Sequence, residues 1–236
     1  MKAINLLLIC TFSLLNQDSL FNEFIKLFPK VSYDENGTYL TRYLNSHSVV
    51  NLKNNYTIIP DRLSLNNLVD GDSSRLFYKS RFYNVDEDRY LESIEHNNFY
   101  AIKSIVAPQY KLVIYANFYL ENKYFYLKSF DKEGHPNGMQ LINEVIYASA
   151  IADYSYKYTL FTEGGFRIFS YKKNNDNDHE EMKTKVVISC YEIDKRGFFK
   201  LSLKDSTYLG GSINQYSKFD SEPEVDDPVY KYWTLR

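Results

Sequence analysis

The sequence predicts a mainly β fold, an antiparallel meander closed as a barrel or a propeller-like sheet, with one short N-terminal helix. The chain has 236 residues, of which 17% are aromatic, with 23 Tyr and 16 Phe. These side chains favour the pleated, half-buried surface of a sheet. From about residue 38 onward, aromatic and β-branched runs alternate with short polar turns, which is the pattern of consecutive hairpins.

Composition limits the classes of partner and of stabilising site. Hydrophobic residues make up 44% of the chain, enough for a substantial core, and the formal net charge is −2. No global field therefore favours nucleic acid or an anionic membrane. The two cysteines are Cys10 and Cys190, and loss of an N-terminal leader would leave only the second. We expect no nucleic-acid partner, no internal disulfide in the mature chain and no zinc site built from several cysteines.

Residues 1–16 have the layout of a secretory signal peptide. Lys2 precedes the apolar run 6–15, which is shorter than the roughly 20 residues that a membrane-spanning helix needs. We therefore expect export to the periplasm, the cell surface or the medium, and no transmembrane span in the mature chain. Residues 17–236 are expected to form a single β-rich domain. A buried N-terminal helix or strand is the alternative interpretation of the apolar run.

Residues 18–28 have the spacing of a short amphipathic helix. Asp18 is a suitable N-cap, and Pro29 ends the pattern. The polar face is not rich in Lys or Arg, so packing on the sheet is favoured over a membrane-surface role. The apolar stripe consists of Leu20, Phe21, Phe24, Ile25, Leu27 and Phe28.

The most regular alternation lies in the first strand of a hairpin predicted over residues 109–130. A tight reversal at Glu121-Asn122 leads into its second strand. A slip of one residue would exchange the two faces, so the pattern assigns each side chain to one of them. The core face carries Leu112, Ile114, Ala116, Phe118 and Leu120, and the opposite face carries Lys111, Val113, Tyr115, Asn117 and Tyr119.

Two further hairpins are predicted over residues 154–171 and 185–203. The first turns at Glu163-Gly164-Gly165 and the second at Asp194-Lys195-Arg196-Gly197. The second turn shares an Asp-x-x-Gly form with residues 34–37 and 131–134, in which Asp bonds the backbone and Gly accepts a positive φ. Residues 172–184 form a polar loop, residues 220–227 are irregular, and residues 229–233 are compatible with an edge strand.

No catalytic motif, cofactor-binding motif or paired metal-ligand spacing occurs, so no catalytic, cofactor or metal residue is assigned. The acidic loop 176–181 lacks the glycine and spacing of a calcium-binding EF-hand. Cys190 lies in an apolar strand, which favours a buried core thiol over a nucleophile. The histidines, each interpreted as a surface or loop residue, are His47, His96, His135 and His179.

Three weaker patterns have a functional interpretation. Exposed aromatic side chains bind sugars or partner proteins, although most are expected to pair across strands within the sheet. Asn36-Gly37-Thr38 and Asn55-Tyr56-Thr57 match the N-glycosylation acceptor, which matters only in a eukaryotic secretory pathway. Paired carboxylates hydrolyse glycosides, and the candidates for such a pair are Glu92, Glu95 and Glu144.

The order of a short leader, the motif from Phe21 to Pro29 and later hairpins that include Phe130-Asp131-Lys132-Glu133-Gly134 resembles uncharacterised exported or lipoprotein-like β-rich proteins of Bacteroidota. The chain departs from the lipoprotein pattern because Ile9, and not a small residue, precedes Cys10. The resemblance implies a location in the cell envelope and supplies no active-site residue.

The sequence thus favours a non-catalytic binding or interaction protein of the cell envelope whose ligand is unknown. The expected partner is a glycan or an envelope protein, and no cofactor is expected. The alternative is a carbohydrate-active hydrolase that uses paired carboxylates.

Overall fold

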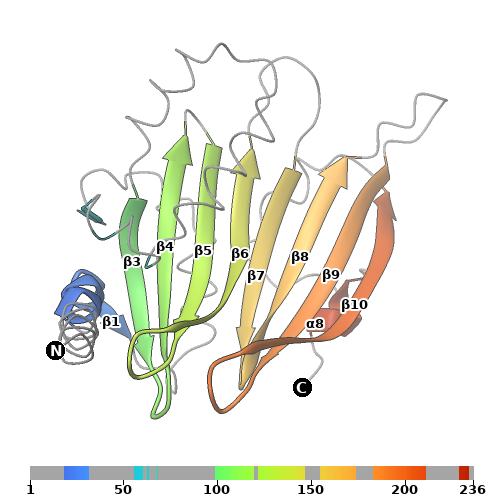
Figure 1. The fold of residues 1–236 in the computed structure, drawn as a ribbon. Helices are drawn as coiled ribbons and strands as arrows, with labels where there is room; N and C mark the ends of the chain where they lie inside the picture. The colour runs from blue at the N-terminus through green and yellow to red at the C-terminus, as the bar shows by residue number, and fades with distance from the viewer. Residues whose placement is uncertain are drawn as a thin grey trace, which may run out of the picture.

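The computed structural model describes ten strands that form one sheet, together with two helical segments (Figure 1). The strands are β1 (Lys30–Val31), β2 (Thr57–Ile58), β3 (Phe99–Val106), β4 (Lys111–Tyr119), β5 (Asn122–Phe130), β6 (Pro136–Ile146), β7 (Ser155–Thr162), β8 (Gly165–Lys173), β9 (Lys183–Ile193) and β10 (Phe199–Gly210). The helical segments are residues 19–26 and α8 (Tyr230–Trp233). The described residues are 19–31, 56–60, 63, 68, 99–119, 122–146, 155–173, 183–210 and 229–233.

Strands β3 to β10 form an antiparallel meander in which each strand pairs with its neighbour in the sequence. The predicted antiparallel, mainly β fold is therefore confirmed. At one end of the meander, β3 also pairs with two short strands, β1 in parallel and β2 antiparallel. At the other end, β10 pairs with β9 alone among the described strands.

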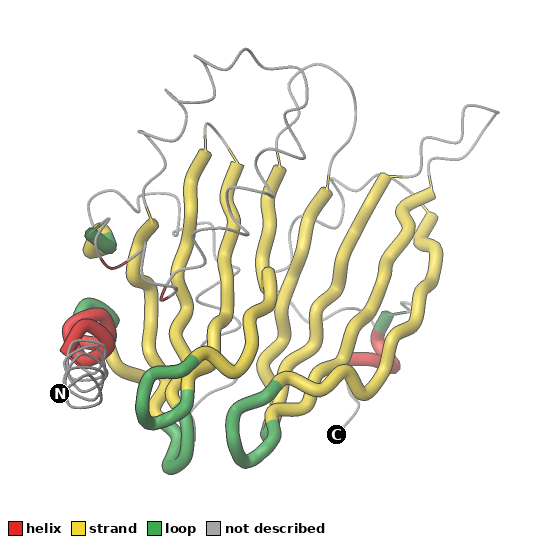
Figure 2. Tube along the Cα trace, in the orientation of Figure 1, coloured by secondary structure: helices red, strands yellow, loops and turns green. Residues whose placement is uncertain are grey.

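The predicted closure as a barrel or a propeller-like sheet is wrong. No described strand joins β10 to β1, β2 or β3, and the sheet is open (Figure 2). The sequence pattern identifies strands and their order, but closure requires a matching tilt and stagger of all the strands. Alternation of apolar and polar residues carries no information on that match.

The buried side chains form three clusters. The first brings β3, β4 and β5 together with β7 and β8, and includes Ile105, Leu112, Ile114, Phe125 and Phe166. The second lies between the helical residues 19–26 and strands β3 to β5, and includes Phe24, Val113, Tyr115, Tyr126 and Phe130. The third joins β7, β8 and β9 to α8, and includes Tyr156, Phe169, Val186, Ile188 and Tyr232.

Both faces of β4 are buried, which differs from the division expected from the alternation. Leu112 and Ile114 belong to the first cluster, while Val113 and Tyr115 belong to the second. The opposite face is buried because the N-terminal helix covers it. Lys111, on that same face, extends its Nζ to 4.6 Å from the centroid of the Phe21 ring. Phe118 and Leu120 lie outside the residues whose side chains are described.

The N-terminal helix is confirmed, and so is its packing on the sheet. Its Phe21 and Phe24 rings lie 5.1 Å and 5.9 Å from the ring of Phe130 on β5. The Asp131–His135 turn closes against the same helix, since a Cβ added to Gly134 would lie 2.6 Å from Cδ1 of Phe21. Gly134 also has a φ of 93°, so this position requires glycine twice over. The proposed N-cap, Asp18, lies outside the described residues.

The three predicted hairpins are present, with one shift in a turn. Tyr119 pairs with Asn122, so residues 120–121 connect β4 and β5, one residue earlier than predicted. That turn has no glycine to mark its position. Glu163-Gly164 connects β7 and β8 as expected, with a φ of 76° at Gly164. The turn at Asp194–Gly197 connects β9 and β10.

The edge strand considered at residues 229–233 is wrong, because these residues contain the helical turn α8. Val229 and Tyr232 are three positions apart, which places both on one side of a helical turn, and both are buried in the third cluster. Arg167 on β8 fixes the turn by donating from Nη1 to the carbonyl oxygen of Tyr232 at 2.6 Å. None of the described helices is long and apolar enough to cross a membrane.

Several predicted segments lie outside the described residues. They are the leader 1–16, the turn 34–37, residues 174–182 of the polar loop, and the acidic segment 220–227.

We expect Ile114→Asp and Val113→Asp to lower the free energy of unfolding by similar amounts, about 3 kcal/mol or more. Each change places a carboxylate in a fully buried position, one on each face of β4. Ile58→Asp is the matched control, because half of the Ile58 side chain is exposed, and it should cost less than about 1 kcal/mol. Denaturant titration of the three variants measures these changes. A mild effect of Val113→Asp would contradict burial beneath the helix.

Candidate functional site

The structure describes three of the residues singled out from the sequence. These are His135 in the β5–β6 turn, Glu144 on β6 and Cys190 on β9. The others lie outside the described residues: Glu92, Glu95, His47, His96, His179, the loop 176–181, Asn36 and Asn55.

Glu144 is a buried carboxylate in an ion pair. Its Oε2 lies 2.8 Å from Nζ of Lys157, its cross-strand partner on β7. The lysine compensates for burial of the carboxylate, so the pair has a structural role at the β6–β7 boundary. A glycoside hydrolase needs a second carboxylate about 5 to 9.5 Å away. The other two candidates for such a pair, Glu92 and Glu95, lie outside the described residues.

Cys190 is buried, as predicted, and belongs to the third cluster. Burial raises the pKa of its thiol, and the positive charge of Arg167, its cross-strand partner on β8, opposes that rise in part. The thiol is therefore protonated near neutral pH, where only the thiolate is a nucleophile. This arrangement supports a core residue and gives no support to a catalytic cysteine.

We expect thiol reagents to label Cys190 slowly in the folded chain and rapidly in denaturant, because burial limits access and the raised pKa leaves little thiolate. Mass spectrometry of the peptide that contains Cys190 separates this labelling from that of Cys10. Cys190→Ser should destabilise the fold by about 1–3 kcal/mol, as for a buried hydroxyl without a partner. Equal labelling rates in the folded and denatured chain would rule out the buried position.

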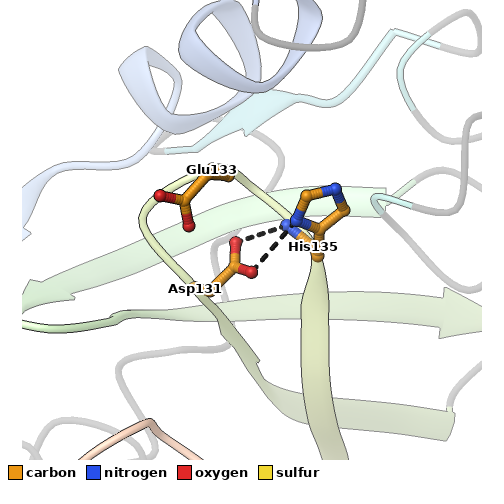
Figure 3. A group of neighbouring side chains, drawn as sticks. All are labelled: Asp131, Glu133 and His135. Carbon is orange, nitrogen blue, oxygen red and sulfur yellow. Dashed lines mark hydrogen bonds and ion pairs between the residues drawn. The ribbon is translucent and has the colours of Figure 1, made fainter. Parts of the chain in front are cut away.

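Three potential metal ligands gather in the β5–β6 turn (Figure 3). One ligand atom from each of Asp131, Glu133 and His135 lies within 4.8 Å of the other two. Asp131 accepts a hydrogen bond from the backbone N–H of His135 at 2.8 Å, and its other oxygen lies 3.0 Å from Nδ1 of the same residue. Burial raises the pKa of Asp131, but these hydrogen bonds and the charge of His135 outweigh it and lower the pKa overall.

The same contacts explain this group as part of the turn. Both Asp131 oxygens already interact with His135, which closes the turn. Glu133 and His135 are exposed. The sequence interpretation overlooked the pairing, although a His directly after an Asp-x-x-Gly turn was a usable signal. Carboxylate and imidazole groups are able to bind a divalent cation, but the turn accounts for the geometry of Asp131 and His135 without one.

The β9–β10 turn is built in the same way. Oδ1 of Asp194 accepts hydrogen bonds from the backbone N–H groups of Arg196 at 2.8 Å and Phe198 at 2.9 Å. The bond from Phe198, with help from Arg196 and Gly197, lowers the pKa of this carboxyl. The turn is thus held in one conformation at the start of β10.

Neighbouring turns at the same end of the strands support this turn (Figure 2). Asn137 on β6 donates from Nδ2 to the carbonyl oxygen of Arg196 at 2.5 Å. A Cβ added to Gly197, whose φ is 90°, would lie 2.8 Å from Cβ of Tyr110 in the β3–β4 turn. Burial, followed by the charge of Asp194, raises the pKa of Tyr110. The first residue of β10, Phe199, packs on the Phe166 ring at 5.2 Å.

Strand β10 is the most exposed of the long strands β3 to β10. It has 12 residues, and every side chain from Lys200 to Ser206 is exposed, so neither face is covered there. Leu201 is 48% exposed, Leu203 is 37% exposed and Tyr208 is 52% exposed. The strand at the opposite end of the meander, β3, is covered by β1 and β2 along part of its edge. The two edges of the sheet therefore differ: other strands cover part of the β3 edge, and no described strand covers the outer edge of β10.

The outer edge of β10 presents backbone hydrogen-bonding groups. In an antiparallel strand these groups point alternately toward the two edges. The N–H of Ser206 donates to Oδ1 of its own neighbour, Asp205, at 2.7 Å, and so points away from β9. By the same alternation, the backbone groups of Lys204 and Tyr208 also point outward. A register shift between Leu201 and Leu203 marks one β-bulge, and the pairing with β9 is regular from Leu203 onward.

The sequence interpretation placed a strand here but overlooked its exposure. Lysines at Lys200 and Lys204, on either side of two leucines, are typical of an edge strand. That signal was present in the sequence, whereas the absence of a cover on either face required the structure.

Comparison of the chain with protein-family models, with curated proteins and with solved structures found no match. The function is therefore inferred from the surfaces of the chain itself. Among the described residues, the outer edge of β10 combines exposed apolar side chains, outward-pointing backbone groups and a fixed conformation.

Proposed function

We propose that the protein is a non-catalytic binding protein of the cell envelope, and that β10 captures an extended segment of its partner as an added strand. The observation that carries this proposal is that β10 is 12 residues long and exposed on both faces, and pairs on one side only among the described strands. In strand addition, main-chain hydrogen bonds provide affinity, and the alternating side chains provide specificity.

The features that protect β10 from indiscriminate pairing also support a selective site. Lysines and bulges on an edge strand discourage contact with other sheets. Here Lys200, Lys204 and the bulge before Leu203 occupy the first half of the strand. The second half is regular and offers the outward carbonyl of Ser206 and the outward backbone groups of Tyr208. A partner must therefore match the first half before it gains the hydrogen bonds of the second.

The strand is also held in place before any partner arrives. Its first residues follow the supported Asp194 turn, and its middle is fixed by Tyr232 of α8, whose hydroxyl donates to Oδ2 of Asp205. This bond and the N–H of Ser206 lower the pKa of Asp205, which keeps the carboxylate charged and bound. A strand that is already ordered loses little conformational entropy on binding, which favours affinity.

We expect Ser206→Pro to abolish the binding of extended peptides while leaving the fold intact. Proline removes an N–H that bonds Asp205 and not β9, so the ladder with β9 is kept, while its ring obstructs an incoming strand. The probe is a random-sequence displayed peptide library selected against the full chain, with affinities of enriched peptides measured by fluorescence anisotropy. Ser206→Thr is the matched control, since it keeps the N–H and favours a strand.

Enriched peptides that bind the native chain and Ser206→Thr, but bind Ser206→Pro at least about tenfold more weakly, would support the proposal. Absence of any enriched peptide, or equal binding to Ser206→Pro, would overturn β10 as the binding edge. A glycan array with a parallel glycosidase assay tests the other half of the proposal, because turnover of a glycoside would overturn a non-catalytic role.

The envelope location is supported by the sequence of residues 1–16, a positive charge followed by a short apolar run. We expect N-terminal sequencing of the protein from a periplasmic, surface or secreted fraction to show that these residues are lost. Lys2→Glu, which removes the positive charge, should retain more of the uncleaved chain in the cytosol. Recovery of the native chain with Met1 intact in the cytosolic fraction would contradict export.

A further inference from the structure

We infer that the segment captured by β10 is an extended polypeptide in which acidic residues flank apolar ones. This inference rests on the proposed function and adds the chemistry of the partner. It follows from the side chains that line the outer edge of β10 and from the lack of charge compensation among them.

The first half of β10 carries positive charge that no described residue neutralises. Lys200 and Lys204 are exposed, and neither forms an ion pair among the described residues. Glu192 lies opposite Lys200 in the register but makes no ion pair with it. Asp205 is bound by Tyr232 and by the N–H of Ser206. Two further cations stand in the adjoining turn: Lys195, and Arg196, whose Nε lies 3.8 Å from Oδ2 of Asp194 and whose side chain is 79% exposed.

Leu201 and Leu203 lie between the two lysines. In the register with β9 they stand opposite Tyr191 and Cys190, which are consecutive residues, so the two leucines lie on different faces of the sheet. An added strand would place its own side chains about 4.5–5.5 Å from those of β10 on each face. Apolar partner residues beside the leucines would cover them, and carboxylates beside the lysines would neutralise them.

A second copy of the chain fits this edge less well. An antiparallel copy centred on Leu201 to Leu203 would bring together two edges that each carry Lys200 and Lys204. The four positive charges would then lie along one contact, which is unfavourable because like charges repel. An acidic and apolar segment places opposite charges at the same two positions, so charge complementarity favours it.

The test uses three peptides and the full-length chain. The peptides share a Leu-Leu core, which places one leucine on each face as in β10, with flanking threonines, and the two positions next to the core carry Glu, Gln or Lys. We expect the Glu peptide to have a Kd at least about tenfold lower than the Lys peptide at low ionic strength, with the Gln peptide between them. The difference should shrink at high salt, which screens exposed charges.

The decisive variant is the double reversal Lys200→Glu and Lys204→Glu, which should invert the order so that the Lys peptide binds most tightly. The matched control is Lys26→Glu and Lys30→Glu, which changes the net charge equally at exposed positions on the helix and β1. The control should preserve the original order. Inversion by the control as well would show that net charge, and not the β10 edge, sets the preference, and would overturn the inference.

Other outcomes separate this inference from the proposed function. Equal affinities of the three peptides, all lost in Ser206→Pro, would overturn the acidic partner and leave the binding edge in place. Absence of binding by these peptides and by any library peptide would overturn both. Sedimentation velocity that finds a dimer of the native chain, absent in Ser206→Pro, would identify a second copy as the occupant and overturn the acidic partner.

Discussion

Unbroken antiparallel pairing from β3 to β10 is the constraint on which the other features of this protein depend. Each strand pairs with its neighbour in the sequence. The N-terminal helix packs on the first half of the meander, and α8 packs on the second half. Phe24 and Phe130 anchor the helix at one end, and Arg167 and Tyr232 anchor α8 at the other. The exposed outer edge of β10 is then the direct result of a meander that does not close. The same openness that overturned the expected barrel supplies the only candidate binding edge among the described strands.

Sequence patterns were sufficient for features set by neighbouring residues. Alternation in residues 111–119 predicted the strand β4, and the glycines with positive φ at Gly134, Gly164 and Gly197 marked three turns. Features set by distant residues were not predictable in this way. Burial of Val113 depends on a helix far away in the sequence, and helix formation at Tyr230–Trp233 depends on strands β8 and β9. Closure of the sheet depends on tilt and stagger, which no single strand encodes.

The same distinction between features set by neighbouring residues and features set by distant residues applies to the candidate site. Burial of Cys190 followed from its apolar neighbours in the strand, so the sequence was enough. The ion pair of Glu144 with Lys157 was not foreseen, because it depends on the short stretch of register that joins β6 and β7. The exposure of Leu201 and Leu203 is the clearest case, since the same alternation in a central strand would have meant a buried core. Their lysine neighbours hinted at an edge, but only the fold shows that neither face is covered.

The pairing of β1 with β3 has a consequence for the order of folding. The pairings between consecutive strands from β3 to β10 close short loops, which costs little chain entropy. By contrast, the Ser104 hydroxyl bonds the carbonyl oxygen of Phe28, 76 residues away, next to the parallel pair of Lys30 with Ser104. Contacts between distant residues form slowly, because the intervening chain must be restrained before they repay that cost. We therefore expect the hairpins to assemble first and the N-terminal helix to dock later, covering the face of β4 that is buried beneath it.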